Sequence, residues 1–194
     1  MYFRGHATFQ LLRFGIGVGV RSGGIFMGKL WKKGRGKLGL MEPLLGDWLA
    51  EADSPMGPVR CERSLEQILG GAYIRLDARW KFAKPPVQTA AGSSSKYGKP
   101  YQELAIFGPG DEGKIVFWSF TSDGKRSEGK LTDASDIHEE AIAFEAKMPA
   151  GIARMVYWPD GEEGLFWAAE SKSAKGWNRF VKHHCSRIVV TDDR

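Results

Sequence analysis

Apolar and charged residues alternate along several short segments of the chain, as in β-strands that bury one face. The clearest case is residues 74–82, IRLDARWKF, where every second side chain is apolar and the others are charged. Turn sequences such as SPMG, LGG, SDGK and PDGEEG separate these segments. We expect strands at about residues 47–53, 57–67, 72–82, 101–108, 114–121, 125–131, 137–148, 152–158, 164–171 and 176–187.

This spacing predicts an all-β fold, a single antiparallel meander β-barrel of about ten strands, because closure removes exposed sheet edges. Two segments depart from simple alternation: residues 114–121 and 164–171 are apolar on both faces. Three explanations are open for these two segments. They lie beneath the segment that leads into the barrel, they lie beneath the head of the chain, or they form an association surface. A homodimer is therefore one alternative. Residues 83–100, rich in Pro, Ser and Gly, form the one long loop that we expect.

Composition and charge place this barrel in a soluble globular protein. The 194 residues suit one domain, with 42% hydrophobic and 26% charged residues. The first 40 residues contain eight basic residues and no acid, while the remainder carries a net charge of −3. We divide the chain into a poorly ordered basic, glycine-rich head, 1–40, and a barrel domain, 41–194. A targeting segment and an upstream extension of the reading frame are alternatives for the head. The body gives no electrostatic case for nucleic acid.

The two cysteines, and the absence of common catalytic motifs, limit the compartments and the classes of function that the sequence supports. Cys61 and Cys185 are too few for a disulfide framework, which predicts a reducing compartment, the cytoplasm. No apolar run reaches the length of a membrane span. Glycine-rich phosphate loops and the G-x-S-x-G elbow are absent, which favours a binding protein over an enzyme.

Several short motifs, MEPLLGDW, SPMGPV, LGGAY, FWSFTSDGKRSEG and WNRF, resemble those of a group of bacterial calycin-like β-barrel proteins. The resemblance covers roughly residues 35–187. It implies a barrel related in architecture to lipocalins, fatty-acid-binding proteins, which hold a carboxylate with inward arginines, and nitrobindins, which hold haem through a late-strand histidine. Of the nitrobindin-like pattern G-x-W-x-G-x-G, Gly46 and Trp48 match, whereas Ala50 and Ala52 stand at the later glycine positions.

The last expected strand carries a histidine among apolar neighbours. Alternation places Arg179, Val181, His183 and Cys185 on one face, which we expect to point inward. A neutral imidazole in an apolar interior is a competent axial ligand for haem iron, so His183 is the candidate metal ligand and haem the candidate cofactor. The alternative is a histidine that is hydrogen-bonded to barrel neighbours or solvated near the rim.

Two arginines also fall on expected inner faces. Arg63 is in phase with Val59 and Cys61, and Arg179 with His183. A buried arginine is costly unless it is paired, and a ligand carboxylate would pair with it bidentately. An internal acid such as Glu66 or Glu140 is the alternative partner.

We therefore predict a non-catalytic binding protein for a small, largely apolar ligand. A carboxylate is one option for the ligand's polar end. Alternatives are a nitrobindin-like haem protein that handles nitric oxide or peroxide, and a structural or homodimeric module with a filled barrel. The predicted ligand-binding residues are Arg63, Arg179, Trp80, Phe144, Val181 and His183.

Overall fold

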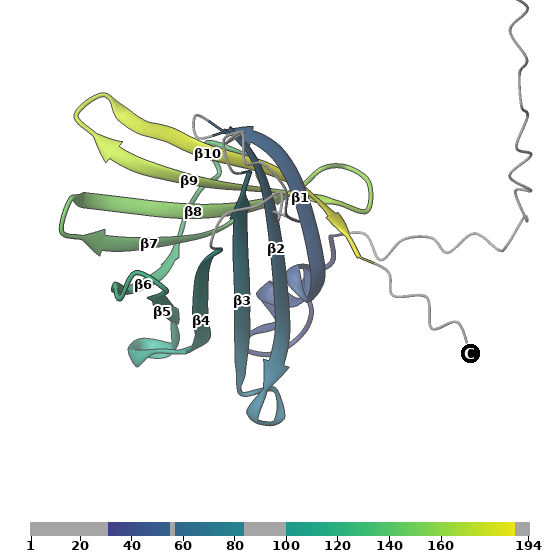
Figure 1. Cartoon of the computed structure of the whole chain (residues 1–194). Helices are drawn as coiled ribbons and strands as arrows, with labels where there is room; N and C mark the ends of the chain where they lie inside the picture. The colour runs from purple at the N-terminus through teal and green to yellow at the C-terminus, as the bar shows by residue number, and fades with distance from the viewer. Residues whose placement is uncertain (1–30, 55–56, 84–99, 189–194) are drawn as a thin grey trace, which may run out of the picture.

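The chain forms one closed antiparallel β-barrel of ten strands, which confirms the predicted all-β meander (Figure 1). The computed structural model describes residues 31–54, 57–83 and 100–188. Each strand pairs with its neighbours in sequence, and β1 closes the barrel against β10. The strands are β1 (Gly46–Ser54), β2 (Gly57–Ile68), β3 (Tyr73–Phe82), β4 (Tyr101–Pro109), β5 (Ile115–Thr121), β6 (Arg126–Thr132), β7 (Ile142–Met148), β8 (Gly151–Pro159), β9 (Leu165–Ser173) and β10 (Gly176–Arg187).

A short 3₁₀ helix, η1 (Gly39–Leu44), covers one end of the barrel beside the start of β1 (Figure 1). Met41 and Leu44 are fully buried there, and the indole of Trp48 donates to the Leu44 carbonyl at 2.8 Å. Gly46 has φ of 114°, a conformation that glycine adopts readily, and it lets the chain turn from η1 into β1. We call this the η1 end, and the opposite end the pocket end.

Two further 3₁₀ turns, η2 (Leu69–Gly71) and η3 (Asp111–Gly113), join β2 to β3 and β4 to β5 at the η1 end. The packed part of the chain starts before the expected boundary at Met41, because Trp31 and Leu38 already contact the core. Most of the predicted head and the long loop lie outside the described residues. No helix in the described ranges is both long and apolar enough to cross a membrane.

The segment before β7 differs from the expected strand 137–148. Its first part turns and crosses the outer face of β7, β8 and β9, and the strand itself begins only at Ile142. Asp133 starts the turn by accepting hydrogen bonds from Ser135, through its backbone N–H at 3.3 Å and its hydroxyl at 2.8 Å. A second small core results, formed by Ala134, Ala143, Val156, Trp158 and Ala168, with Ile137, Ala141 and Phe166 around it.

This second core explains why residues 164–171 are apolar on both faces. The outer face of β9 is covered by the segment before β7, an element that was not among the covers considered from the sequence. The outer face of β5 has no such cover among the described residues, and Phe120 there is 52% exposed.

The barrel interior is filled in its η1 half. Phe107, Phe117 and Phe144 contact one another with ring centroids 4.9–5.8 Å apart, and none is more than 4% exposed. Large aromatic rings in mutual contact leave little free volume in that half. The pocket half of the barrel is less completely filled.

Candidate functional site

A hollow of about 390 Å³ enters the barrel at the pocket end. β1, β2, β3 and β4 line one side of it and β9 and β10 the other, and the volume lies within the usual range for small-molecule sites. Most of its walls are apolar. The lining residues are Asp53, Val59, Trp80, Phe82, Tyr101, Trp167, Ala169, Phe180, Val181, Lys182 and His183.

Three of the predicted site residues, Trp80, Val181 and His183, meet in this pocket. The alternation of β3 brings Trp80 inward, where its ring lies 6.0 Å from that of Trp167 at an angle of 51°. His183 stands directly across from Trp167 in the pairing of β9 with β10, and their rings are 5.4 Å apart. Trp80, Trp167 and His183 thus form the inner wall of the pocket.

Arg63 lies in contact with this inner wall, in the barrel interior. Its guanidinium carbon is 4.3 Å from the ring centre of Trp167 and 5.4 Å from that of Trp80. Its Nη2 donates to the hydroxyl of Tyr157 across the barrel at 2.8 Å. The residue is only 2% exposed. The predicted inward orientation of Arg63 is therefore present, and it places a positive charge deep in the barrel.

Four buried polar atoms around this point have no hydrogen-bond partner in the described part of the chain. They are Nε and Nη1 of Arg63, Nε1 of Trp167 and Nδ1 of His183. Buried polar groups in folded proteins are nearly always paired, and each exception needs an explanation. Here all of the exceptions gather on side chains that contact one another.

No described carboxylate forms an ion pair with Arg63. The two acids suggested by the sequence point elsewhere: Glu66 pairs with Arg75 on the outer face at 2.7 Å, and Glu140 lies in the segment before β7. Glu103 acts on Arg63 only through its longer-range charge, and it accepts a hydrogen bond from the Ser119 hydroxyl at 2.6 Å.

The groups nearest to Arg63 are neutral and do not balance its charge. Burial raises the pKa of Tyr157 to about 12, against the opposing effect of the Arg63 charge, so the phenol stays protonated. Burial, and then the charge of Arg63, lower the pKa of His183 to about 4, so the imidazole is neutral near pH 7.

The predicted inward orientation of Arg179 is wrong. The pairing of β10 with β9 shifts between Arg179 and Val181, and this bulge turns Arg179 to the outer face. There its Nε donates to Glu170 at 2.8 Å, and its guanidinium lies over Trp158 of the second core. Arg179 is exposed and does not line the pocket.

Phe144, which the sequence predicts as a ligand-binding residue, does not line the pocket either. It points inward as expected, but it packs between Phe107 and Phe117 in the filled half of the barrel. Its fully buried ring is part of the core and not of a ligand surface.

Both cysteines are buried inside the barrel as free thiols. Burial raises the pKa of each, that of Cys185 to about 12, so neither forms the thiolate that nucleophilic chemistry requires. Among the described residues, no group of three or more His, Cys, Asp or Glu side chains could hold a metal ion.

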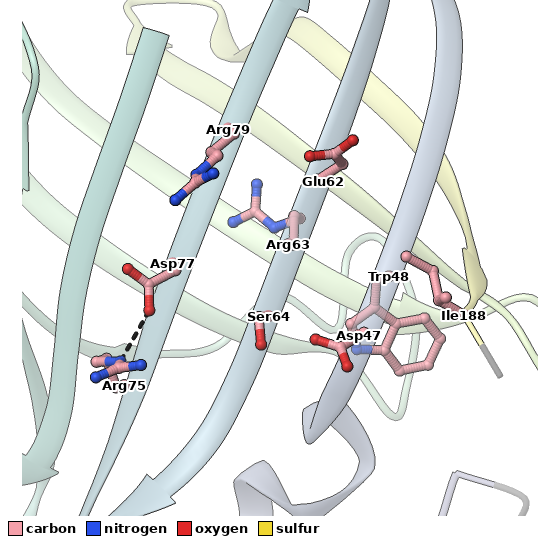
Figure 2. Close-up of a pocket in the computed structure, with 9 residues that line it drawn as sticks. All are labelled: Asp47, Trp48, Glu62, Arg63, Ser64, Arg75, Asp77, Arg79 and Ile188. Atoms are coloured by element: carbon pink, nitrogen blue, oxygen red, sulfur yellow. Dashed lines mark ion pairs between the residues drawn. The ribbon is translucent and has the colours of Figure 1, made fainter. Parts of the chain in front are cut away.

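A second hollow, of about 430 Å³, lies over β1, β2 and β3, and its lining includes Arg63 beside the outward charged residues (Figure 2). The small side chain of Ser64 leaves room between Asp47 and Asp77, which stand opposite it on the neighbouring strands. Asp77 is already paired with Arg75 at 2.8 Å, and the surface is open to water. Because exposed charges lose little when they lack a ligand, this hollow is a weaker candidate than the interior.

Tyr157 and Trp167 belong to the site but were not predicted. Trp167 lies in a segment that is apolar on both faces, so alternation could not assign its direction. Tyr157 lies in the run MVYW, which has the same ambiguity. Their contacts with Arg63 join β2 to β8 and β9, and no short-range pattern reports such pairs.

The fold and the site together define a closed ten-stranded antiparallel barrel with an apolar pocket and an unpaired buried cation beside it. A scan against protein-family models finds no match for the chain, and neither does a search of curated proteins.

Proposed function

We propose that the protein is a non-catalytic binding protein for a small, largely apolar molecule with a carboxylate end. The observation that carries this proposal is the buried guanidinium of Arg63, which has no carboxylate partner among the described residues and contacts Trp80 and Trp167 of the pocket wall. The pocket walls would take the apolar part, and Arg63 the carboxylate.

The physical reason is the cost of the unbound state. A buried charge without a counter-ion carries a desolvation penalty of several kcal/mol, and each unpaired donor adds about 1–3 kcal/mol. A carboxylate would neutralise the guanidinium and accept its free N–H groups in short, charge-assisted hydrogen bonds. An anionic ligand therefore offsets the free-energy cost of burying Arg63 without a counter-ion.

The route to Arg63 passes the rings of Trp80 and Trp167. Both rings line the pocket, and both contact the guanidinium, so a carboxylate that reaches Arg63 from the pocket changes the surroundings of both rings. We expect ligand binding to change tryptophan fluorescence for this reason.

Family and compartment form part of the same proposal. The motifs that resemble calycin-like proteins agree with a ligand-binding barrel. The free thiols of Cys61 and Cys185 suit a reducing compartment such as the cytoplasm.

The test compares decanoate with decanol by isothermal titration calorimetry on the full chain. We expect decanoate to bind at least tenfold more tightly, and Arg63→Gln to abolish the difference. Arg179→Gln is the matched control, since it removes an arginine that points outward, and it should leave both affinities unchanged. Equal binding of acid and alcohol to the wild type would contradict the role of Arg63. No binding of either would contradict the apolar pocket as well.

A second candidate function is haem binding, which one observation favours: His183 is a neutral imidazole that lines the pocket. The fit is incomplete, because an axial histidine usually donates its other N–H to an acceptor, and no described residue supplies one. Haem would supply the iron chemistry for nitric oxide or peroxide. In a haemin titration, a saturable one-to-one Soret shift that His183→Ala abolishes would promote this function to first place. No shift, or the same shift in both proteins, would remove it.

A further inference from the structure

Two of the unpaired atoms are not explained by a carboxylate on Arg63. Nε1 of Trp167 and Nδ1 of His183 are buried on the rings that form the inner wall of the pocket. The two residues are cross-strand partners, and their ring centroids are 5.4 Å apart. The pair therefore has hydrogen-bonding capacity that no described residue uses, and a polar group of a bound ligand could use it.

The chemistry of the two rings selects that group. The indole N–H of Trp167 only donates, so the group facing it must accept. His183 is neutral, and its Nδ1 carries either a proton or a lone pair depending on the tautomer. A hydroxyl satisfies both rings, because it accepts from the indole and can either donate to or accept from the imidazole. A methylene at that position would leave both ring nitrogens unpaired.

The distance between this pair and Arg63 fixes where the hydroxyl lies on the ligand. The guanidinium carbon of Arg63 is 4.3 Å from the centre of the Trp167 ring, so the two groups are in direct contact, and a hydroxyl bound beside Trp167 is only a few bonds from a carboxylate on Arg63. A ligand whose carboxylate meets Arg63 has its second or third carbon beside Trp167 and His183. The more distant carbons then extend into the apolar pocket between Trp80 and Val181.

We propose that the ligand is a 2- or 3-hydroxy acid with an apolar tail, and that Trp167 and His183 are the residues that select the hydroxyl. This inference rests on the proposed function, since it assumes a carboxylate on Arg63. It adds a second polar feature to the ligand and assigns that feature to two named side chains.

The experiment measures three acids with the same chain length: octanoate, 2-hydroxyoctanoate and 3-hydroxyoctanoate. Isothermal titration calorimetry on the full wild-type chain should show one of the hydroxy acids binding about tenfold more tightly than octanoate, as expected when a hydroxyl pairs buried polar groups. Trp167→Phe, which removes the N–H but keeps an aromatic ring, and His183→Leu should each reduce that advantage, measured within each variant as the ratio of the hydroxy-acid affinity to the octanoate affinity.

Val181→Ala is the matched control, because it removes apolar contact from the same pocket and should weaken all three acids equally. Equal affinities of the three acids for the wild type would overturn the inference while leaving the proposed function intact, and this comparison does not depend on any variant folding. A hydroxy-acid preference that persists in both ring variants would also overturn it. If none of the three acids binds, the proposed function itself fails.

Discussion

The unpaired charge of Arg63 predicts that its removal makes the protein more stable. The perturbation is Arg63→Met together with Tyr157→Phe: methionine keeps a long side chain at a position that is 2% exposed, and phenylalanine removes the hydroxyl that would lose its partner. Most core substitutions destabilise a protein, so a gain would be diagnostic.

The expected magnitude follows from the contacts of the guanidinium. The double variant loses a charged hydrogen bond to Tyr157, worth about 1.5–3 kcal/mol, and the contact with Trp167, worth about 2 kcal/mol. It also removes two unpaired nitrogens, at about 1–3 kcal/mol each, which roughly offsets those losses. What remains is the desolvation penalty of the charge, and replacing buried ionic groups by apolar ones is commonly neutral or stabilising by about 1–4 kcal/mol. We expect a gain of about 2 kcal/mol.

The assay is urea unfolding of both proteins without ligand, supported by thermal melts, in which the gain corresponds to about 4–8 °C for a chain of this size. Arg154→Met is the matched comparison. Arg154 is equally buried, but it holds Asp136 through two hydrogen bonds of 2.9 and 2.6 Å and Glu170 through one of 2.7 Å. Its removal leaves the buried Glu170 with Arg179 alone and should cost about 3 kcal/mol.

The two buried arginines should therefore change stability in opposite directions. A double variant of Arg63 and Tyr157 that loses more than about 1 kcal/mol would show that the guanidinium is a structural element of the barrel. That result would refute the interpretation of its unpaired N–H groups as donors to an anionic ligand.

Three further outcomes follow from particular residues. Between pH 7 and pH 5 the protein should lose about 2 kcal/mol of unfolding free energy through His183, whose pKa of about 4 lies below its unfolded value, so the unfolded chain binds the proton first. Urea midpoints of wild type and His183→Leu across this range test it, and equal slopes would contradict it. Phe144→Ala should cost about 3–5 kcal/mol by urea unfolding but leave decanoate affinity unchanged, because this ring is core and not pocket wall; a large loss of affinity would argue otherwise. If β5 forms a homodimer surface, size-exclusion chromatography at two concentrations should show a dimer that Phe120→Ser abolishes, and a wild-type monomer at both concentrations speaks against it.

Most of the strands were predictable because they bury one face and because short turns join most neighbouring strands. In β3, apolar Ile74, Leu76 and Trp80 alternate with charged residues, and the structure buries this same set. Alternation fails where the backbone is irregular. A bulge in β10 reverses the direction of Arg179. The sequence of β10 has no glycine or proline at the bulge from which it could have been predicted.

The segment before β7 shows a second limit of alternation. His138 and Glu140 continue the period of Ile142 and Phe144, so the sequence predicts one strand where the structure has a turn and then a strand. Tertiary packing decides this case, because the outer faces of β8 and β9 are apolar and need a cover. Alternation could not identify Tyr157 and Trp167 as site residues either. Both belong to the site through contacts with Arg63, which lies about a hundred positions earlier in the chain.

The comparison of Arg63 with Arg154 also bears on whether the barrel is only a filled structural module. The chain is able to pair a buried arginine fully, since Arg154 has carboxylate partners on two sides. In the interior, by contrast, Arg63 contacts a neutral phenol and two indole rings and lies near a neutral imidazole, and the carboxylate of Glu103 acts on it only through its longer-range charge. A module that needed only a packed interior would be better served by an apolar side chain there, because the η1 half already shows that aromatic rings fill this barrel without polar groups. The unpaired charge beside an apolar pocket is therefore accounted for more simply by an anionic ligand than by the stability of the fold.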